Sequence, residues 1–325
     1  MGISSRINRA GPFRLKSKGG KLVDKYPVVI FVYKRLNETK RTIDSLIKNP
    51  QSSDTNLIVF VDGAKNESDQ FAINEVVDYI SSLTAFKSIS ITQRKENLGL
   101  AKSFIDGISE VLSKYDAAIF LEDDNLLSVD FLYFMNLALN EYLNDSKVLA
   151  VTGYSFPLIP RMTKPYFVHG AGTWSMGTWA RSWDLFESDA ASALREVDKR
   201  GLMAKMNMYG IDFYSMLKKQ VNGEIDSWGV RWWATAVIND MVTLYPGTPM
   251  CVNIGGNAKG THTMTSDPLM NRESNLSQNF KAALPKSQEQ SRAILIRFKL
   301  MHINLSVLRL EKRVKRFLFR IRRAN

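Results

Sequence analysis

Four short, largely apolar segments constrain the fold most strongly, because a predicted helix separates each one from the next. They lie at residues 27–33, 57–61, 89–92 and 117–121. Near-continuous apolar runs of this length are typical of strands covered on both faces of a parallel sheet. The intervening segments carry apolar residues at helical spacing. The alternation predicts a doubly wound α/β fold, to which residues 148–151 add a further strand.

Polar side chains follow the predicted strands where each one ends. Arg35, Asp62, Asn97 and Asp124 occupy these positions. Because ligands of such sheets bind beyond the carboxyl ends of the strands, we expect these four residues to share one site.

The strand ending at Leu121 leads directly into three acids, Glu122, Asp123 and Asp124. Adjacent carboxylates repel one another, so a bound cation would stabilise them. All the available side-chain ligands are oxygen, which favours Mg²⁺ or Mn²⁺ over zinc, and such ions complete their shell with water and a substrate diphosphate. The structural alternative is a solvated turn before a helix that begins at Phe131.

The second half is rich in tryptophan and glycine. Tryptophan faces are common in carbohydrate sites, and their polar surroundings make Trp179 and Trp228 the candidates here, although core filling explains a tryptophan equally well. Asp226 precedes a tryptophan-rich helix and could be its N-cap or a general base. The glycine-dense segment 252–262 could wrap a diphosphate through its backbone N–H groups, with Gly260 and His262 in it; the alternative for His262 is an exposed loop histidine.

The charge of the chain is concentrated at its ends. The net charge is +12; residues 1–25 carry seven Lys/Arg and one Asp, and residues 292–325 carry eleven and one Glu, so the middle is 12 − 6 − 10 = −4. A general polyanion-binding surface, and with it nucleic-acid binding, is therefore not indicated. The single cysteine excludes an internal disulfide, and no apolar stretch predicts a signal peptide or a membrane span.

The basic C-terminal segment has the spacing of an amphipathic helix. Apolar residues recur at 294, 298, 301, 305 and 308, and then at 307, 310, 314, 317 and 321. A basic amphipathic helix of this kind is typical of one that lies on an anionic membrane surface. Packing on the domain itself, or on a partner, is the alternative.

Three motifs in order resemble glycosyltransferases of the GT-A fold. The segment from Ala118 to Phe134, with its Glu-Asp-Asp triplet, resembles the metal motif of the alpha-mannoside N-acetylglucosaminyltransferase I family. The Ser-Trp-x-x-x-Trp segment from Ser227 to Trp232 and the Asn-Ile-Gly to Gly-Thr-His loop from Asn253 to His262 are similar to bacterial family 2-like members. The resemblance spans about residues 27–265.

The resemblance implies a role for each candidate residue. It assigns Asp124 to the metal and Asp226 to the catalytic base of an inverting reaction. The acceptor candidates remain Trp179 and Trp228, which their polar surroundings indicate. This chain has Asp-Ser-Trp at Asp226 where the family has Asp-Asp-Trp. The donor residues that follow from the resemblance are Arg35, Asp62, Asn97, Gly99, Glu122, Asp123, Gly260 and His262.

The expected protein is thus a Mn²⁺- or Mg²⁺-dependent transferase that uses a nucleotide-diphosphate sugar, with UDP-sugar expected first. Its acceptor would be a saccharide or lipid-linked saccharide. The protein itself would lie on the cytoplasmic face of a bacterial inner membrane. A membrane-surface carbohydrate-binding protein is the non-enzymatic alternative. A sugar nucleotidyltransferase is disfavoured because no glycine follows the first strand, at residues 33–37. The expected division is a flexible basic arm (1–25), a nucleotide-sugar half (26–151), an acceptor and catalytic half of the same GT-A domain (152–290), and the basic helix (291–325).

Overall fold

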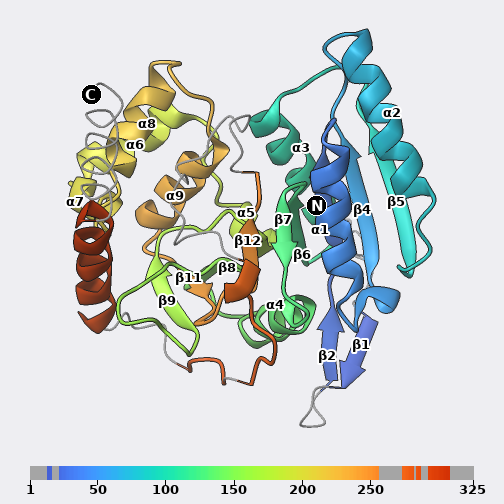
Figure 1. Cartoon of the computed structure of the whole chain (residues 1–325). Coiled ribbons are helices and arrows are strands. Elements are labelled where there is room, and N and C mark those ends of the chain that lie inside the picture. Colours follow the sequence, from blue (N-terminus) through green and yellow to red (C-terminus); the bar gives the residue numbers. More distant parts are fainter. Residues whose placement is uncertain (1–12, 17–21, 256–272, 282, 287–291, 308–325) are drawn as a thin grey trace, which may run out of the picture.

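A mixed sheet of eight strands with helices on both faces forms the centre of the computed structural model (Figure 1). The model describes residues 13–16, 22–255, 273–281, 283–286 and 292–307. The strand order is β5-β4-β3-β6-β10-β8-β11-β9. This mainly parallel α/β architecture is the expected GT-A fold. Its strands are β3 (Val28–Val32), β4 (Asn56–Val61), β5 (Ser88–Gln93), β6 (Ala117–Glu122), β8 (Val148–Thr152), β9 (Tyr166–His169), β10 (Met176–Trp179) and β11 (Val242–Tyr245).

Alternate residues of the central strands enter different cores. On β3, Val28 and Ile30 pack with helices α1 (Leu36–Ile47), α2 (Glu67–Ser81) and α4 (Phe131–Glu141). Val29 and Phe31 instead pack with α3 (Leu100–Leu112) and α9 (Trp228–Ile238). Burial on both sides explains why the strand is apolar throughout. Because β3 runs parallel to β4 and β6, the segments that follow these strands meet at one edge of the sheet.

The second half of the chain adds strands to the same sheet. β10 lies antiparallel between β6 and β8, and β9 and β11 complete the far edge. Short helices after β10 form a further core with α9. These helices are α6 (Ala190–Lys199), α7 (Met203–Met206) and α8 (Phe213–Val221), whereas α5 (Ala180–Trp183) packs in the core that contains α3.

A small two-stranded ribbon connects distant parts of the sequence beside the acidic triplet. β7 (Asn125–Leu127) pairs antiparallel with β12 (Cys251–Asn253), and the register places Asn253 opposite Asn125. The ribbon thereby brings residues 253–255 against Asp124. Two short 3-10 turns are η1 (Ser52–Asp54) and η2 (Glu273–Asn275).

The expectation of a flexible arm over residues 1–25 is wrong for part of that segment. β1 (Phe13–Lys16) and β2 (Leu22–Lys25) form an antiparallel hairpin. Apolar and charged residues alternate in β1, and a Gly-Gly pair lies between the two strands, which is a hairpin pattern that the basic composition obscures. Residues 1–12 and 17–21 lie outside the described part of the chain.

The predicted basic helix is present over residues 292–307, and its first apolar stripe packs on the domain itself. Ile294, Phe298, Met301 and Leu305 are buried in the core of the second half. The ring of Phe298 lies 4.8 Å from that of Phe156, centroid to centroid. The structural alternative is therefore the correct one for this stripe. Among the described residues, no helix has both the length and the apolar character needed to cross a membrane.

Candidate active site

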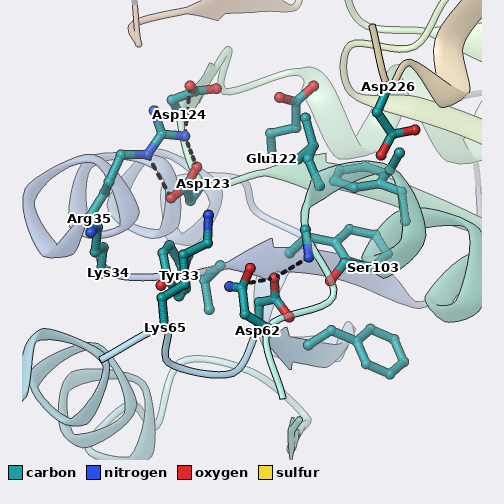
Figure 2. Close-up of a pocket in the computed structure, with 18 of the residues that line it drawn as sticks. Tyr33, Lys34, Arg35, Asp62, Lys65, Ser103, Glu122, Asp123, Asp124 and Asp226 are labelled. Atoms are coloured by element: carbon teal, nitrogen blue, oxygen red, sulfur yellow. Dashed lines mark hydrogen bonds and ion pairs between the residues drawn. The ribbon is translucent and has the colours of Figure 1, made fainter. Parts of the chain in front are cut away.

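One cleft at the carboxyl edge of the sheet gathers most of the predicted site residues. Its volume is about 610 Å³. Figure 2 shows the segments after β3, β4 and β6 turned toward this cleft, together with Asp226 from the segment before α9. The predicted residues that line it are Arg35, Asp62, Asn97, Gly99, Glu122, Asp123, Asp124 and Asp226.

Asp62 organises one wall of the cleft. Its carboxylate accepts hydrogen bonds from the backbone N–H groups of Gly63, Leu98 and Gly99 at 2.8–3.0 Å and from Nδ2 of Asn97 at 3.1 Å. Gly99 has φ +75°, a conformation that favours glycine. The two segments after β4 and β5 are thus held together by a single carboxylate, which accounts for the Asn-x-Gly sequence.

Arg35 holds the acidic triplet from the end of β3. Its Nε lies 3.0 Å from Oδ2 of Asp123, its Nη2 donates to Oδ1 of the same carboxylate, and Nη2 lies 2.9 Å from Oδ2 of Asp124. Burial alone would lower the pKa of Arg35, but the bonds and charges of the two aspartates outweigh it and raise that pKa. The guanidinium therefore stays charged and offsets part of the negative charge of the triplet.

The triplet itself is enclosed, and this raises the pKa of each carboxyl. Burial raises the pKa of Asp123 to about 6, against the opposing effect of Arg35. Burial, followed by the charges of Asp124 and Asp123, raises the pKa of Glu122 to about 8. The pKa of Asp124 is also raised by burial, while Arg35 and Asn253 act in the opposite direction. A cation bound beside the triplet would lower these pKa values and favour the charged carboxylates.

Asn253 and Gly255 belong to the glycine-dense segment predicted to wrap a diphosphate, and the structure places both against Asp124. Nδ2 of Asn253 donates to Oδ1 of Asp124 at 2.6 Å, and Oδ1 of Asn253 accepts from the Gly255 N–H at 3.0 Å. A Cβ at Gly255 would lie 2.1 Å from Oδ2 of Asp124, so only glycine fits there. The Asn-Ile-Gly motif indicates this segment in the sequence, but it does not reveal the contact with Asp124. Gly260 and His262 of the same loop lie outside the described residues.

Asp226 lies at the rim of the cleft and does not cap α9. The N-cap is Ser227, whose Oγ accepts from the Val230 N–H. The Asp226 side chain is 68% exposed and lies 3.3 Å from Nη2 of Arg231. Figure 2 shows its carboxylate on the side of Glu122, opposite Arg35. An exposed carboxylate beside a cation is free to accept a proton from a ligand bound in the cleft.

Neither of the two tryptophans predicted to contact the acceptor lines the cleft. Trp179 is 1% exposed and donates from Nε1 to the Leu139 carbonyl, so it fills the core, and its predicted acceptor contact is not supported by its place. Trp228 is also buried and stacks on Phe104, which lines the cleft. Trp174, in the glycine-rich segment before β10, is the tryptophan that lines the cleft.

The oxygen chemistry of the triplet fits a hard cation held by one carboxylate. Among the described residues there is no group of three or more His, Cys, Asp or Glu side chains placed to hold a metal. Mg²⁺ and Mn²⁺ do not need one, since they are commonly bound by one or two carboxylates together with water and substrate phosphates. Asp124, whose polar neighbours are Arg35 and two asparagines, is the residue that could hold such an ion.

Part of the sequence matches the model of a known protein family. Residues 28–166 match the model of glycosyl transferase family 2, from β3 to the first residue of β9. The matched segment includes the strands that bring Arg35, Asp62 and the acidic triplet to the cleft, and the match agrees with the GT-A fold. No curated protein matches the chain.

Several solved glycosyltransferases show a distant likeness. The mannosyltransferase PcManGT from Pyrobaculum calidifontis, in complex with GDP-Man and Mn²⁺, is 13% identical over 53% of this chain and 51% of its own, with a TM-score of 0.33. S. aureus TarS is 13% identical over 68% and 36%, with a TM-score of 0.39. TarS 1–349 in complex with UDP is 13% identical over 54% and 49%, with a TM-score of 0.34. This chain thus spans about half or less of their length, and likeness of this degree carries no information on substrates.

Proposed function

We propose that the protein is an inverting, metal-dependent glycosyltransferase that moves a sugar from a nucleoside-diphosphate sugar to a saccharide or lipid-linked saccharide, in the synthesis of a surface polysaccharide. A UDP-sugar is the donor to test first. The observation that carries the proposal is the cleft itself. It joins the acidic triplet with Arg35 on one side and the exposed carboxylate of Asp226 on the other. The closer kinship with the alpha-mannoside N-acetylglucosaminyltransferase I family rests on the Glu-Asp-Asp segment and belongs to the same proposal.

The proposed division of labour follows from the environment of each carboxyl. Asp226 is exposed at the rim of the cleft, where an acceptor can reach its carboxylate, so it would take the proton of the acceptor hydroxyl. The acceptor oxygen then forms a bond to the anomeric carbon as the bond from that carbon to the diphosphate breaks, which inverts the configuration. General-base assistance of this kind contributes a factor of about 10² to 10⁴.

The proposed metal would be Mn²⁺ or Mg²⁺ on Asp124. Such an ion would supply positive charge against the departing diphosphate. Asn253 and Arg35 both contact the Asp124 carboxylate, so the protein itself fixes the position of this metal-binding side chain. Asp62 and Asn97 shape the neighbouring wall, where the base of the nucleotide is proposed to lie.

The aromatic part of the cleft supports a sugar ligand. Trp174 lines the cleft, and its ring meets that of Tyr154 edge to face at 4.9 Å, which holds it in place. Sugar C–H surfaces stack favourably on such rings, so we assign Trp174 to the saccharide in place of Trp179.

The test is calorimetric titration with a panel of nucleotide sugars and nucleotides, with and without Mn²⁺, followed by a transfer assay with the donor that binds. Asp124→Ala is expected to abolish metal-dependent binding. Asp226→Asn is expected to retain binding and lose about 10² to 10⁴ in turnover, the range of general-base catalysis. Asp184→Asn, an exposed aspartate outside the cleft, is the matched control. NMR of the product would show whether the anomeric configuration is inverted.

The opposite results identify the alternatives. Near-normal turnover by Asp226→Asn would refute its role as the base. If no nucleotide binds under either condition, the non-enzymatic carbohydrate-binding alternative becomes the better account of the cleft.

A further inference from the structure

The C-terminal helix (residues 292–307) has a second apolar stripe on its outer side. We name Ile296, Leu300, Ile303 and Val307 the outer stripe. Their exposed fractions are 58%, 40%, 61% and 49%, and no other described helix has four large exposed apolar residues. Figure 1 shows this helix, in dark red, at the edge of the second half of the molecule.

Helix geometry places the outer stripe opposite the buried one. At about 100° per residue, positions 296, 300, 303 and 307 fall within about 60° of one another. The buried residues Ile294, Phe298, Met301 and Leu305 lie about half a turn away and contact the core. A helix that is apolar on two opposite sides needs a cover for both, and the domain covers only one of them.

The sequence after residue 307 repeats the spacing of the outer stripe. Residues Leu310, Val314, Phe317 and Ile321 follow Val307 at steps of three and four, in phase with the outer stripe. The buried stripe, by contrast, has no such continuation beyond Leu308. The apolar pattern that extends toward the end of the chain is therefore the outer one.

The charges beside the outer stripe are all of one sign in the described helix. Residues 292–307 contain Arg292, Arg297 and Lys299 and no acid, and Arg292 and Lys299 are exposed. The sequence from 308 to 325 adds eight Lys/Arg and a single Glu. Such a surface complements anionic lipid headgroups, whereas a second copy of the chain would bring two strongly basic segments together.

We propose that the outer stripe lies in the interface of an anionic lipid bilayer, with the flanking Lys and Arg residues on the headgroups. The side of the helix that faces the membrane is therefore opposite to the stripe that begins at Ile294. That stripe packs on the domain itself. Because the proposal rests on the C-terminal helix alone, it is independent of the transfer reaction.

Vesicle flotation with the full-length protein tests the proposal. The vesicles are pure phosphatidylcholine or phosphatidylcholine with phosphatidylglycerol, at low and high salt. We expect binding to the anionic vesicles, weakened by salt because the charges are screened. Ile296→Ser combined with Ile303→Ser is expected to lower the partition coefficient about tenfold or more, because two apolar side chains leave the interface.

The matched control is Phe71→Ser combined with Leu185→Ser, two exposed apolar residues outside the C-terminal helix. It is expected to bind vesicles like the wild type. A fluorescent probe on Ile303→Cys should shift to shorter wavelength with anionic vesicles, while the same probe on Phe71→Cys should not. The native Cys251 is buried, so the introduced thiol is the one that reacts.

Three results would overturn the proposal. These are no binding to anionic vesicles, equal loss of binding in the control variant, or a wild-type dimer that the Ile296/Ile303 variant converts to a monomer without any vesicle binding. The last result would assign the outer stripe to a second copy of the chain.

Discussion

Replacing Asn253 with alanine tests whether the ribbon of β7 and β12 holds the acidic site together. The change removes two hydrogen bonds, one to the Asp124 carboxylate at 2.6 Å and one from the Gly255 N–H at 3.0 Å. Asn253 is 5% exposed, so water does not simply take its place. A hydrogen bond to a charged group contributes about 1.5–3 kcal/mol, and we expect the free energy of unfolding to fall by about that amount.

The same loss should appear in ligand binding. Without the amide, the Asp124 carboxylate keeps Arg35 and Asn125 as its side-chain partners in the described part of the chain. If the full 1.5–3 kcal/mol is lost from the bound state, the affinity for Mn²⁺ and nucleotide falls by about tenfold to about a hundredfold. Urea unfolding followed by tryptophan fluorescence gives the first quantity, and calorimetric titration gives the second.

The control is Asn56→Ala, which removes a hydrogen bond between exposed side chains of β4 and β5. It should change the free energy of unfolding by no more than about 0.5 kcal/mol. If Asn253→Ala matched this control in both measurements, the bond to Asp124 would not contribute, and the argument from the ribbon would fail.

Three further experiments test other parts of the structure. Gly255→Ala should abolish metal-dependent nucleotide binding in a titration while circular dichroism stays unchanged, because its Cβ would force the Asp124 carboxylate to move; unchanged binding would contradict the geometry. Burial lowers the pKa of His169, so the unfolded state takes up its proton first, and the free energy of unfolding should fall as the pH drops below about 6.5. The melting temperature of His169→Gln should fall less than that of the wild type over this range, and an equal fall would refute the assignment. Burial raises the pKa of the Cys251 thiol to about 12, so Ellman's reagent should leave the folded protein unmodified and titrate one thiol per chain in guanidinium chloride; rapid reaction of the folded protein would show that β12 opens.

The first half of the fold could be predicted because its signals are local. The apolar runs of β3, β4 and β6 report burial on both faces, and in a parallel sheet this alone places Arg35, Asp62 and Asp124 at one edge. The position of Asp226 at the same cleft could not be derived from spacing. It depended on a resemblance between motifs.

The errors came from features that a local pattern does not distinguish. Trp179 and Trp174 both lie in glycine-rich segments, and only the insertion of β10 between β6 and β8 decides that Trp179 turns into the core. The C-terminal helix carries two apolar stripes, and the sequence does not say which one the domain covers. Asn253 became a site residue through strand pairing with β7, a contact between residues far apart in the chain.

The ribbon of β7 and β12 also sets the order in which the site can form during synthesis. Asp124 and Asn253 are separated by 129 positions. At about 5–20 residues per second, a ribosome needs about 6–26 s to translate that interval. During this time the strands β3 to β6 and the three acids have been translated, while the amide that fixes Asp124 has not. A nascent chain truncated before residue 253 should therefore fold much of its sheet yet lack a competent site.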